Sequence, residues 1–274
     1  MPIIKRIQWV FAFFLLLALL FIFRFQLTNR IQQRILSGLD KETALSNRAL
    51  LSNGAAHQDH GIYGLSGKGR IWPHRVNSFL RFTYLYPYFP GFECDIRFNS
   101  GGQQLFVAHD STEINTLTFV DYLKADPDHK LFWLDVKNLS DANRQAFAAQ
   151  MQALDSRFNI KNRVILESSD TASLAYLNGL GFLTSYYIPG LDIPESINRK
   201  KLISGIRGFL EQHPMLISQD IRMQVLMEKY FPGRLQLCWD LAFLDGMSRK
   251  VLSQRAKDSN LLLCLINVKS PGYQ

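Results

Sequence analysis

Two carboxylates and a histidine interrupt the apolar stretch GFECDIRFNSGGQQLFVAHD. Glu93 and Asp95 stand two residues apart in its first apolar run, and His109 ends its second run, after a Gly-Gly turn. Carboxylates held close together repel each other, and burying them unpaired costs free energy. A divalent cation removes both penalties, and an all-oxygen ligand set favours Mg²⁺ or Ca²⁺ over zinc. Ion pairs with Arg75 or Arg97 are the alternative explanation.

Charged and acid–base side chains also end other apolar runs. His74 and Arg75 follow the run RIWP, and Asp135 and Lys137 end the run LFWLDVK. Three successive apolar runs that each end in such residues are difficult to explain by core packing or surface charge alone. Glu167 ends a further run, RVILES, but its alternation with the residues before it leaves the direction of its side chain open.

The spacing of these residues fits β-strands. Alternate residues of a strand point to the same side, so Glu93 shares a face with Asp95, and Asp135 shares a face with Lys137. If the hairpin turn is centred near Gly101, His109 lies opposite Glu93, about 5 Å away between Cβ atoms. The strands would then bring both ends of this stretch to one site.

Apolar β-type runs alternate with amphipathic helical segments from residue 71 onward, as in the segment SDANRQAFAAQMQAL, where Phe147, Met151 and Leu154 share one face. Nine runs read as strands, and the second and third are joined by the short hairpin NSGG. Eight strands with following helices predict an α/β fold, a (β/α)8 TIM barrel over 71–274. A doubly wound open sheet is the alternative, although its G-x-G-x-x-G loop does not occur. The nine runs are RIWPH, FECDIRF, QLFVAH, LFWLDVK, RVILES, FLTSYYI, PMLIS, LQLCWD and LLLCLINV.

The N-terminus contains an uncharged apolar segment, WVFAFFLLLALLFIF, with Lys5 and Arg6 before it and Arg24 after it. With its neighbours it approaches the roughly 20 residues that span a bilayer, and no small-residue cleavage site follows it. We therefore expect an uncleaved transmembrane helix at 1–26, with a cleaved secretory signal as the alternative. A basic juxtamembrane helix and a glycine-rich linker would occupy 27–70.

The net charge of +8 is concentrated near the predicted anchor. Residues 1–50 hold seven basic and two acidic side chains, and the remainder hold 24 basic and 21 acidic ones. This distribution fits anionic lipid headgroups and argues against a nucleic-acid partner. The three cysteines, Cys94, Cys238 and Cys264, lack metal-ligand spacing and are expected as small buried side chains in strands.

The segments HRVNS, GFECDIRFNSGGQQLFVAHD and LDVKN together resemble the signature of the glycerophosphodiester phosphodiesterases and the wider phospholipase-C-like phosphodiesterase barrels. HRVNS and LDVKN are closest to the sphingomyelinase-D-like and menorin-like members of that superfamily. The resemblance covers about 71–272 and includes LQLCWDLAF, whose Trp239 matches a tryptophan near the substrate. It implies a TIM barrel that acts on a phosphodiester with a divalent cation.

The resemblance also assigns roles to individual residues, since each stands where the family's motif has a functional one. His74 and His109 match two acid–base histidines, and Arg75 and Lys137 match residues that bind the phosphate. Trp239 would line the substrate pocket. The metal ligands would be Glu93, Asp95 and Asp135.

The sequence departs from the family pattern at three places. Val76 replaces the usual Gly, Asn77 and Ser78 replace the usual Pro-Glu-Asn-Thr, and Asp135 replaces the usual Glu. We therefore predict a membrane-anchored phosphodiesterase for glycerophosphodiesters or a phospholipid headgroup. A non-catalytic, membrane-tethered barrel that acts as a binding or assembly factor is the alternative. We expect a single-pass protein of a bacterial inner membrane. The similar Lys/Arg counts on the two sides of the apolar segment leave its orientation open, and a periplasmic or extracytoplasmic barrel is favoured.

Overall fold

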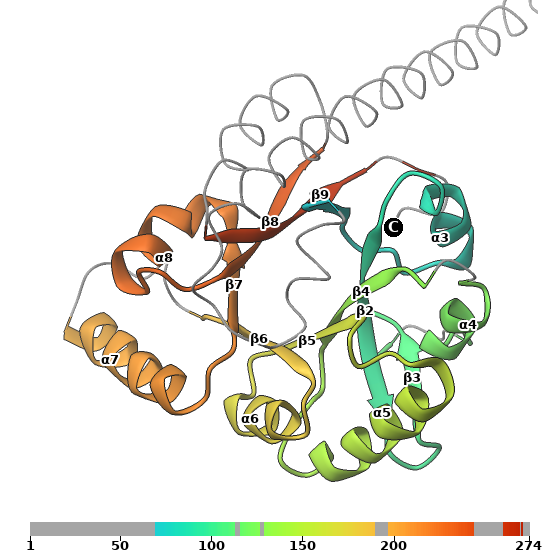
Figure 1. Ribbon diagram of the computed structural model, residues 1–274, viewed down its shortest axis with the longest axis horizontal. Helices are drawn as coiled ribbons and strands as arrows, with labels where there is room; N and C mark the ends of the chain where they lie inside the picture. The colour runs from blue at the N-terminus through green and yellow to red at the C-terminus, as the bar shows by residue number, and fades with distance from the viewer. Residues whose placement is uncertain are drawn as a thin grey trace, which may run out of the picture.

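The structure is a computed structural model that describes residues 69–112, 116–126, 129–189, 197–243, 260–268 and 270. The alternating apolar runs form one curled sheet, and the helices lie around its outside (Figure 1). The strands are β1 (Ile71–Pro73), β2 (Gly91–Asn99), β3 (Gln104–Val107), β4 (Leu131–Val136), β5 (Val164–Ser168), β6 (Leu183–Tyr187), β7 (Leu216–Asp220), β8 (Gln236–Phe243) and β9 (Leu261–Asn267). The helices are α3 (Phe79–Leu85), α4 (Phe119–Lys124), α5 (Arg144–Phe158), α6 (Thr171–Gly179), α7 (Ile197–Gln212), the 3-10 turn η1 (Ile221–Met223) and α8 (Gln224–Tyr230).

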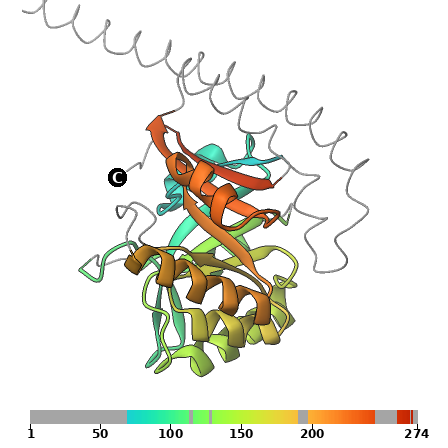
Figure 2. The same cartoon turned by 90° about the vertical axis from the view of Figure 1, so that its left-hand side faces the viewer.

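The nine strands run in the order β1-β9-β8-β7-β6-β5-β4-β2-β3. β3 is antiparallel to β2, and every other pair of neighbouring strands is parallel. The first strand therefore pairs with the last, and the curl brings β1 beside β2, where the Val76 N–H donates to the Glu93 carbonyl at 2.8 Å. Figure 2 shows the same curl from the side. The prediction of an α/β fold with a curled, TIM-like sheet is confirmed, and all nine predicted runs form strands.

The two faces of the sheet carry different side chains. Outward residues such as Phe92 and Phe132 pack against the helices, and the predicted apolar face of α5 is buried there. Inward residues such as Trp133, Ile165 and Leu237 form a second apolar cluster inside the curl. Strand alternation therefore leaves the inner face free to carry the charged residues near the ends of the strands. The three cysteines are free and buried, as predicted.

Close packing joins β1 to β2 where the sheet curls onto itself. A Cβ atom on Gly91 would lie 2.6 Å from the indole of Trp72, so only glycine fits under that ring. Trp72 is fully buried, and its Nε1–H donates to the Gly69 carbonyl at 3.2 Å. The loop that follows β1 is therefore held directly over the start of β2.

Helix α3 fixes the same loop from the other side. Ser78 caps the helix and accepts a hydrogen bond from the Arg81 N–H at 3.2 Å. The fully buried Arg81 guanidinium donates to the carbonyls of Val268, at 2.6 Å, and His74, at 2.9 Å, and also to Ser270 Oγ. Arg81 thus joins the end of β1 to the residues that follow β9.

The predicted anchor at 1–26 and almost all of the segment 27–70 lie outside the described residues, so both stay predictions. Within the described ranges, no helix is both long enough and apolar enough to cross a bilayer.

Candidate active site

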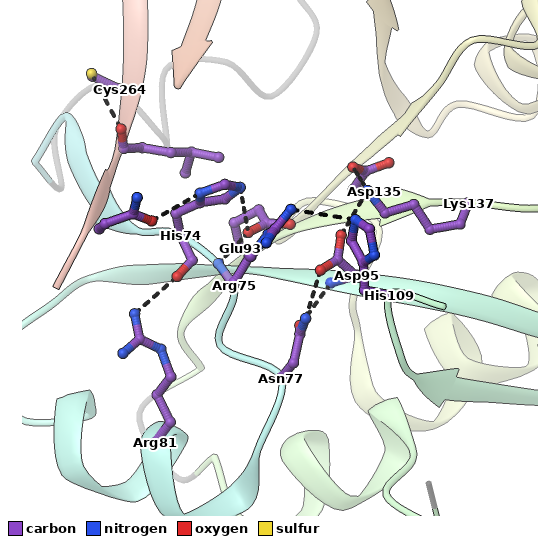
Figure 3. Close-up of polar contacts among 12 residues, drawn as sticks. His74, Arg75, Asn77, Arg81, Glu93, Asp95, His109, Asp135, Lys137 and Cys264 are labelled. Carbon is purple, nitrogen blue, oxygen red and sulfur yellow. Dashed lines mark hydrogen bonds and ion pairs between the residues drawn. The ribbon is translucent and has the colours of Figure 1, made fainter. Parts of the chain in front are cut away.

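The predicted metal ligands come together where β2 and β4 lie side by side. Asp95 and Asp135 are register partners on these two parallel strands. Glu93 lies two residues before Asp95 and therefore on the same face of β2. Each of the three offers a carboxylate oxygen, and these oxygens all lie within 4.8 Å of one another. Figure 3 shows Glu93, Asp95 and Asp135 beside the loop that carries His74 and Arg75.

Two residues of the loop after β1 hold these carboxylates in place. The Arg75 backbone N–H donates to Glu93 Oε2 at 2.5 Å, and Arg75 itself adopts a left-handed φ of 56°. Asn77 Nδ2 donates to Asp95 Oδ2 at 2.5 Å, while Asn77 Oδ1 accepts the Asp95 N–H at 3.0 Å. The asparagine that departs from the family pattern therefore binds both the side chain and the backbone of a candidate ligand.

Lys137 is the cationic partner of the cluster. Its Nζ lies 2.8 Å from Asp95 Oδ1 and 2.6 Å from Asp135 Oδ2. Arg97, proposed from the sequence as an alternative partner, instead donates to the His109 carbonyl at 3.2 Å. The positive charge predicted to contact a phosphate therefore lies inside the acidic cluster.

Burial and mutual repulsion set the charge of the cluster. Burial, and then the charges of Asp95 and Asp135, raise the pKa of Glu93 well above its ordinary value. Burial also raises the pKa of Asp135. For Asp95, burial acts in the same direction, but Lys137 and Asn77 outweigh it and lower the pKa. Burial alone would lower the pKa of Lys137, whereas Asp135 and Asp95 raise it. Glu93 and Asp135 therefore resist ionisation in the cation-free site, and a bound cation would offset this penalty.

His74 faces the cluster as a neutral base. Its Nδ1 lies 3.1 Å from Asn267 Oδ1, an atom that can only accept, so Nδ1 carries the hydrogen and Nε2 keeps its lone pair. Nε2 lies 3.7 Å from Glu93 Oε2. Burial, and then the charge of Arg75, lower the pKa of His74 to about 4. The imidazole is therefore neutral near pH 7.

His109 lies at the more exposed edge of the site. Its Nε2 is 3.3 Å from the Arg75 guanidinium, which can only donate, and its Nδ1 is 3.0 Å from Asp110 Oδ1. The Asp110 carboxylate thus accepts from Nδ1 and orients the ring toward Arg75.

The predicted pairing of Glu93 with His109 is wrong. β2 and β3 pair with Ile96 opposite Val107, one residue away from the predicted register, and β3 ends at Val107. The Ala108 N–H then donates to the Asp95 carbonyl at 3.0 Å. His109 reaches the site from the loop beyond the strand, so it still faces Arg75 and the cluster (Figure 3).

A cavity of about 330 Å³ opens beside the cluster. Its walls include the predicted pocket residue Trp239 and also Tyr187, whose ring centroid lies 5.3 Å from that of Trp239. Glu167, whose direction the sequence left open, lines the same cavity. The cavity thus has a charged wall from β1, β2 and β4 and an aromatic wall from β6 and β8.

The three carboxylates suit a hard divalent cation. They offer only oxygen ligands, Glu93 and Asp95 are each 1% exposed, and two of the three carboxyl pKa values are raised by their shared burial. Glu93, Asp95 and Asp135 would hold the ion. The sequence alone did not predict that Asn77 and Asn267 belong to the site. Their partners, Asp95 and His74, lie 18 and 193 residues away along the chain.

Comparison with solved structures identifies the fold. A structure from Silicibacter pomeroyi, described as a glycerophosphoryl diester phosphodiesterase, matches with a TM-score of 0.53 and 15% identity, covering 78% of this chain and 95% of that one. A glycerophosphodiester phosphodiesterase from Parabacteroides distasonis matches with a TM-score of 0.51 and 15% identity, covering 73% and 92%. The chain has the glycerophosphodiester phosphodiesterase fold. No protein-family model and no curated protein matches the sequence.

Proposed function

We propose that the protein is a phosphoric diester hydrolase that uses a divalent cation, Mg²⁺ or Ca²⁺, to cleave a glycerophosphodiester or a phospholipid headgroup. One observation carries the proposal: three carboxylates converge within 4.8 Å beside two histidines, an arginine and a lysine. Solved structures of the same fold, described as glycerophosphodiester phosphodiesterases, support the substrate class.

Charge is the main obstacle to this reaction, because a phosphodiester is an anion that repels its nucleophile. The bound cation would act as a Lewis acid on a phosphoryl oxygen. Arg75 and Lys137 would bind the other oxygens and stabilise the negative charge that develops on them. Both side chains line the cavity, so their positive charges already lie where a phosphate would bind.

The two histidines would divide the proton transfers between them. His74, neutral because its pKa is lowered to about 4, would take a proton at Nε2 from the nucleophile, which is either water or a neighbouring hydroxyl of the substrate. His109 would first take a proton at Nε2 from solvent, in place of its contact with Arg75. As the new P–O bond forms and the ester P–O bond breaks, it would give this proton to the leaving alkoxide. Asp110 would stabilise the protonated ring of His109 through Nδ1.

The test is turnover by the purified full-length chain in detergent, with Ca²⁺ or Mg²⁺, against a set of glycerophosphodiesters and lysophospholipids. We expect hydrolysis that EDTA abolishes, and a loss of about 10²- to 10⁴-fold in kcat/KM for His74→Ala and His109→Ala. Glu93→Gln should lose both activity and cation binding. His213→Ala, which removes a histidine outside the cavity lining, serves as the control.

If no substrate is turned over and both histidine variants are indistinguishable from wild type, the proposed enzymatic function is wrong. The barrel would then be the non-catalytic binding or assembly factor that the sequence also allowed.

A further inference from the structure

Glu167 stands in line with the candidate metal ligands. The parallel register places Asp95 beside Asp135, Asp135 beside Glu167, and Glu167 beside Ser185, on four adjacent strands. Register partners on parallel strands point to the same face, and neighbouring strands lie about 4.8 Å apart. The row therefore continues the acidic cluster across the floor of the cavity, one strand beyond Asp135.

The Glu167 carboxylate is buried but incompletely paired. The residue is 4% exposed and lines the cavity, and its Oε2 has no hydrogen-bond partner among the described residues. Burying such an oxygen without a partner is costly, and buried polar atoms in folded proteins are nearly always satisfied by protein or ordered water. The Ser218 hydroxyl lies close enough to this carboxyl to lower its pKa, although burial outweighs it and the pKa is raised. The capacity of the two carboxylate oxygens beyond this one hydroxyl is left for a partner from the cavity.

Other polar atoms around Glu167 have the same need. Trp133, two residues before Asp135 on β4, is fully buried, and its Nε1–H is unpaired within the described part of the chain, as is Ser185 Oγ. Trp133 lines the cavity, and Ser185 is the register partner of Glu167 on β6. This part of the cavity therefore carries polar atoms that ordered water can satisfy.

Distance decides how Glu167 would contribute. Glu93, Asp95 and Asp135 bring their oxygens within 4.8 Å of one another, and Glu167 lies one strand outside this triad. Asp135 is one methylene shorter than the glutamate usual at its position, and Mg²⁺ or Ca²⁺ held by few carboxylates keeps water in its coordination shell. A carboxylate on the next strand can bind that water.

We propose that Glu167 is a fourth carboxylate of the cation centre, which accepts a hydrogen bond from a water molecule that the ion binds on the Asp135 side. This inference rests on the proposed function. Glu167 acts as a positioning residue: its negative charge strengthens binding of the cation, and its hydrogen bond fixes the direction of one coordination position. Partners of this kind typically change metal affinity by 10- to 100-fold.

The experiment measures Ca²⁺ and Mg²⁺ binding to EDTA-treated full-length protein in detergent by titration calorimetry, without substrate. Glu167→Gln keeps the shape of the side chain but removes its charge, and it should weaken binding 10- to 100-fold. Glu211→Gln makes the same substitution at an exposed position of α7 and should bind like wild type. Glu167→Asp keeps the charge but draws it back by one methylene, and its affinity should fall between those of wild type and Glu167→Gln.

A second measurement separates this role from a structural one. Because a ligand stabilises the state that binds it, a saturating cation raises the Tm of wild type, and Glu167→Gln should lose much of this rise at the same cation concentration. Its Tm without cation should equal or exceed that of wild type, since a buried carboxyl, whose charged form burial disfavours, has been replaced by a neutral amide. If Glu167→Gln and Glu167→Asp bind the cation with affinities within twofold of wild type, the inference about Glu167 is wrong, but the proposed function stands. No cation binding by wild type would overturn the proposed function as well.

Discussion

The cavity has two walls of opposite character. On the side of β1, β2 and β4 the lining holds charged side chains beside Trp133, and these are joined by short contacts such as the 2.6 Å pair of Lys137 with Asp135. On the side of β6 and β8 the lining is aromatic and neutral, with Tyr187 and Trp239 5.3 Å apart between ring centroids. Charged side chains cost free energy to bury, so they lie where partners satisfy them.

We infer from this difference that the two walls bind different parts of one substrate. In the proposed function the charged wall would bind the phosphodiester group, whose charge changes during the reaction. The aromatic wall offers flat apolar surface, suited to the part of the substrate that does not react. Changes on the first wall should therefore affect catalysis and cation binding, whereas changes on the second should affect substrate binding.

The largest effect among the following variants is expected on the charged wall from Asn77→Ala. This substitution removes the two hydrogen bonds, of 2.5 and 3.0 Å, that Asn77 makes to Asp95, and leaves the buried carboxylate with its ion pair to Lys137. We expect Ca²⁺ affinity and kcat/KM to fall by about 10- to 100-fold. Calorimetry and steady-state kinetics measure the two quantities, and Asn143→Ala, which removes an asparagine side chain at the start of α5, is the control. Unchanged cation affinity would show that Asp95 needs no such support.

A change of pH tests the charged wall without a substitution. Burial raises the pKa values of Glu93 and Asp135 in the cation-free protein, so at low pH these groups hold protons that a cation must displace. Affinity should therefore rise with pH, by up to about tenfold per pH unit for each proton displaced, and level off once the pH exceeds both pKa values. Calorimetry in buffers of different ionisation enthalpy counts the released protons. A Kd for Ca²⁺ that is constant from about pH 5 to 8 would contradict this account.

The smallest effect is expected on the aromatic wall. Trp239→Ala removes apolar surface but no charge, so KM should rise several-fold, while kcat and Ca²⁺ affinity stay near their wild-type values. Trp239→Phe should restore most of the loss. Steady-state kinetics separates KM from kcat. If kcat instead falls as far as in Asn77→Ala, the two walls are not functionally distinct.

Alternation of residue types was enough to predict most of the scaffold. Apolar runs of β type separated by helical segments located all nine strands, and the two-residue spacing of Glu93 and Asp95 placed both on the inner face. These features depend on local sequence and on the fixed geometry of strands. They could therefore be derived without knowledge of which strands are neighbours.

Contacts between distant segments could not be derived in the same way. The hairpin register was wrong by one residue because the turn gives no sharp signal for its centre, and the actual pairing of Ile96 with Val107 is set by the packing of both strands. The direction of Glu167 depends on its register with Asp135, and the partner of His74 is Asn267, 193 residues further along the chain. A single sequence holds no record of such pairs.

The pairing of β1 with β9 also bears on the order in which the parts of the site form during folding. His74 depends on Asn267 for its tautomer, and its carbonyl shares the Arg81 guanidinium with Val268, so the imidazole is fixed only after β9 has joined β1. Contacts between such distant segments form late, since the loop that they close is long. A chain still being synthesised, or one cut before β9, would carry the acidic cluster of β2 and β4 without the partner that orients His74. The proposed hydrolytic activity would therefore begin only after β9 has paired with β1.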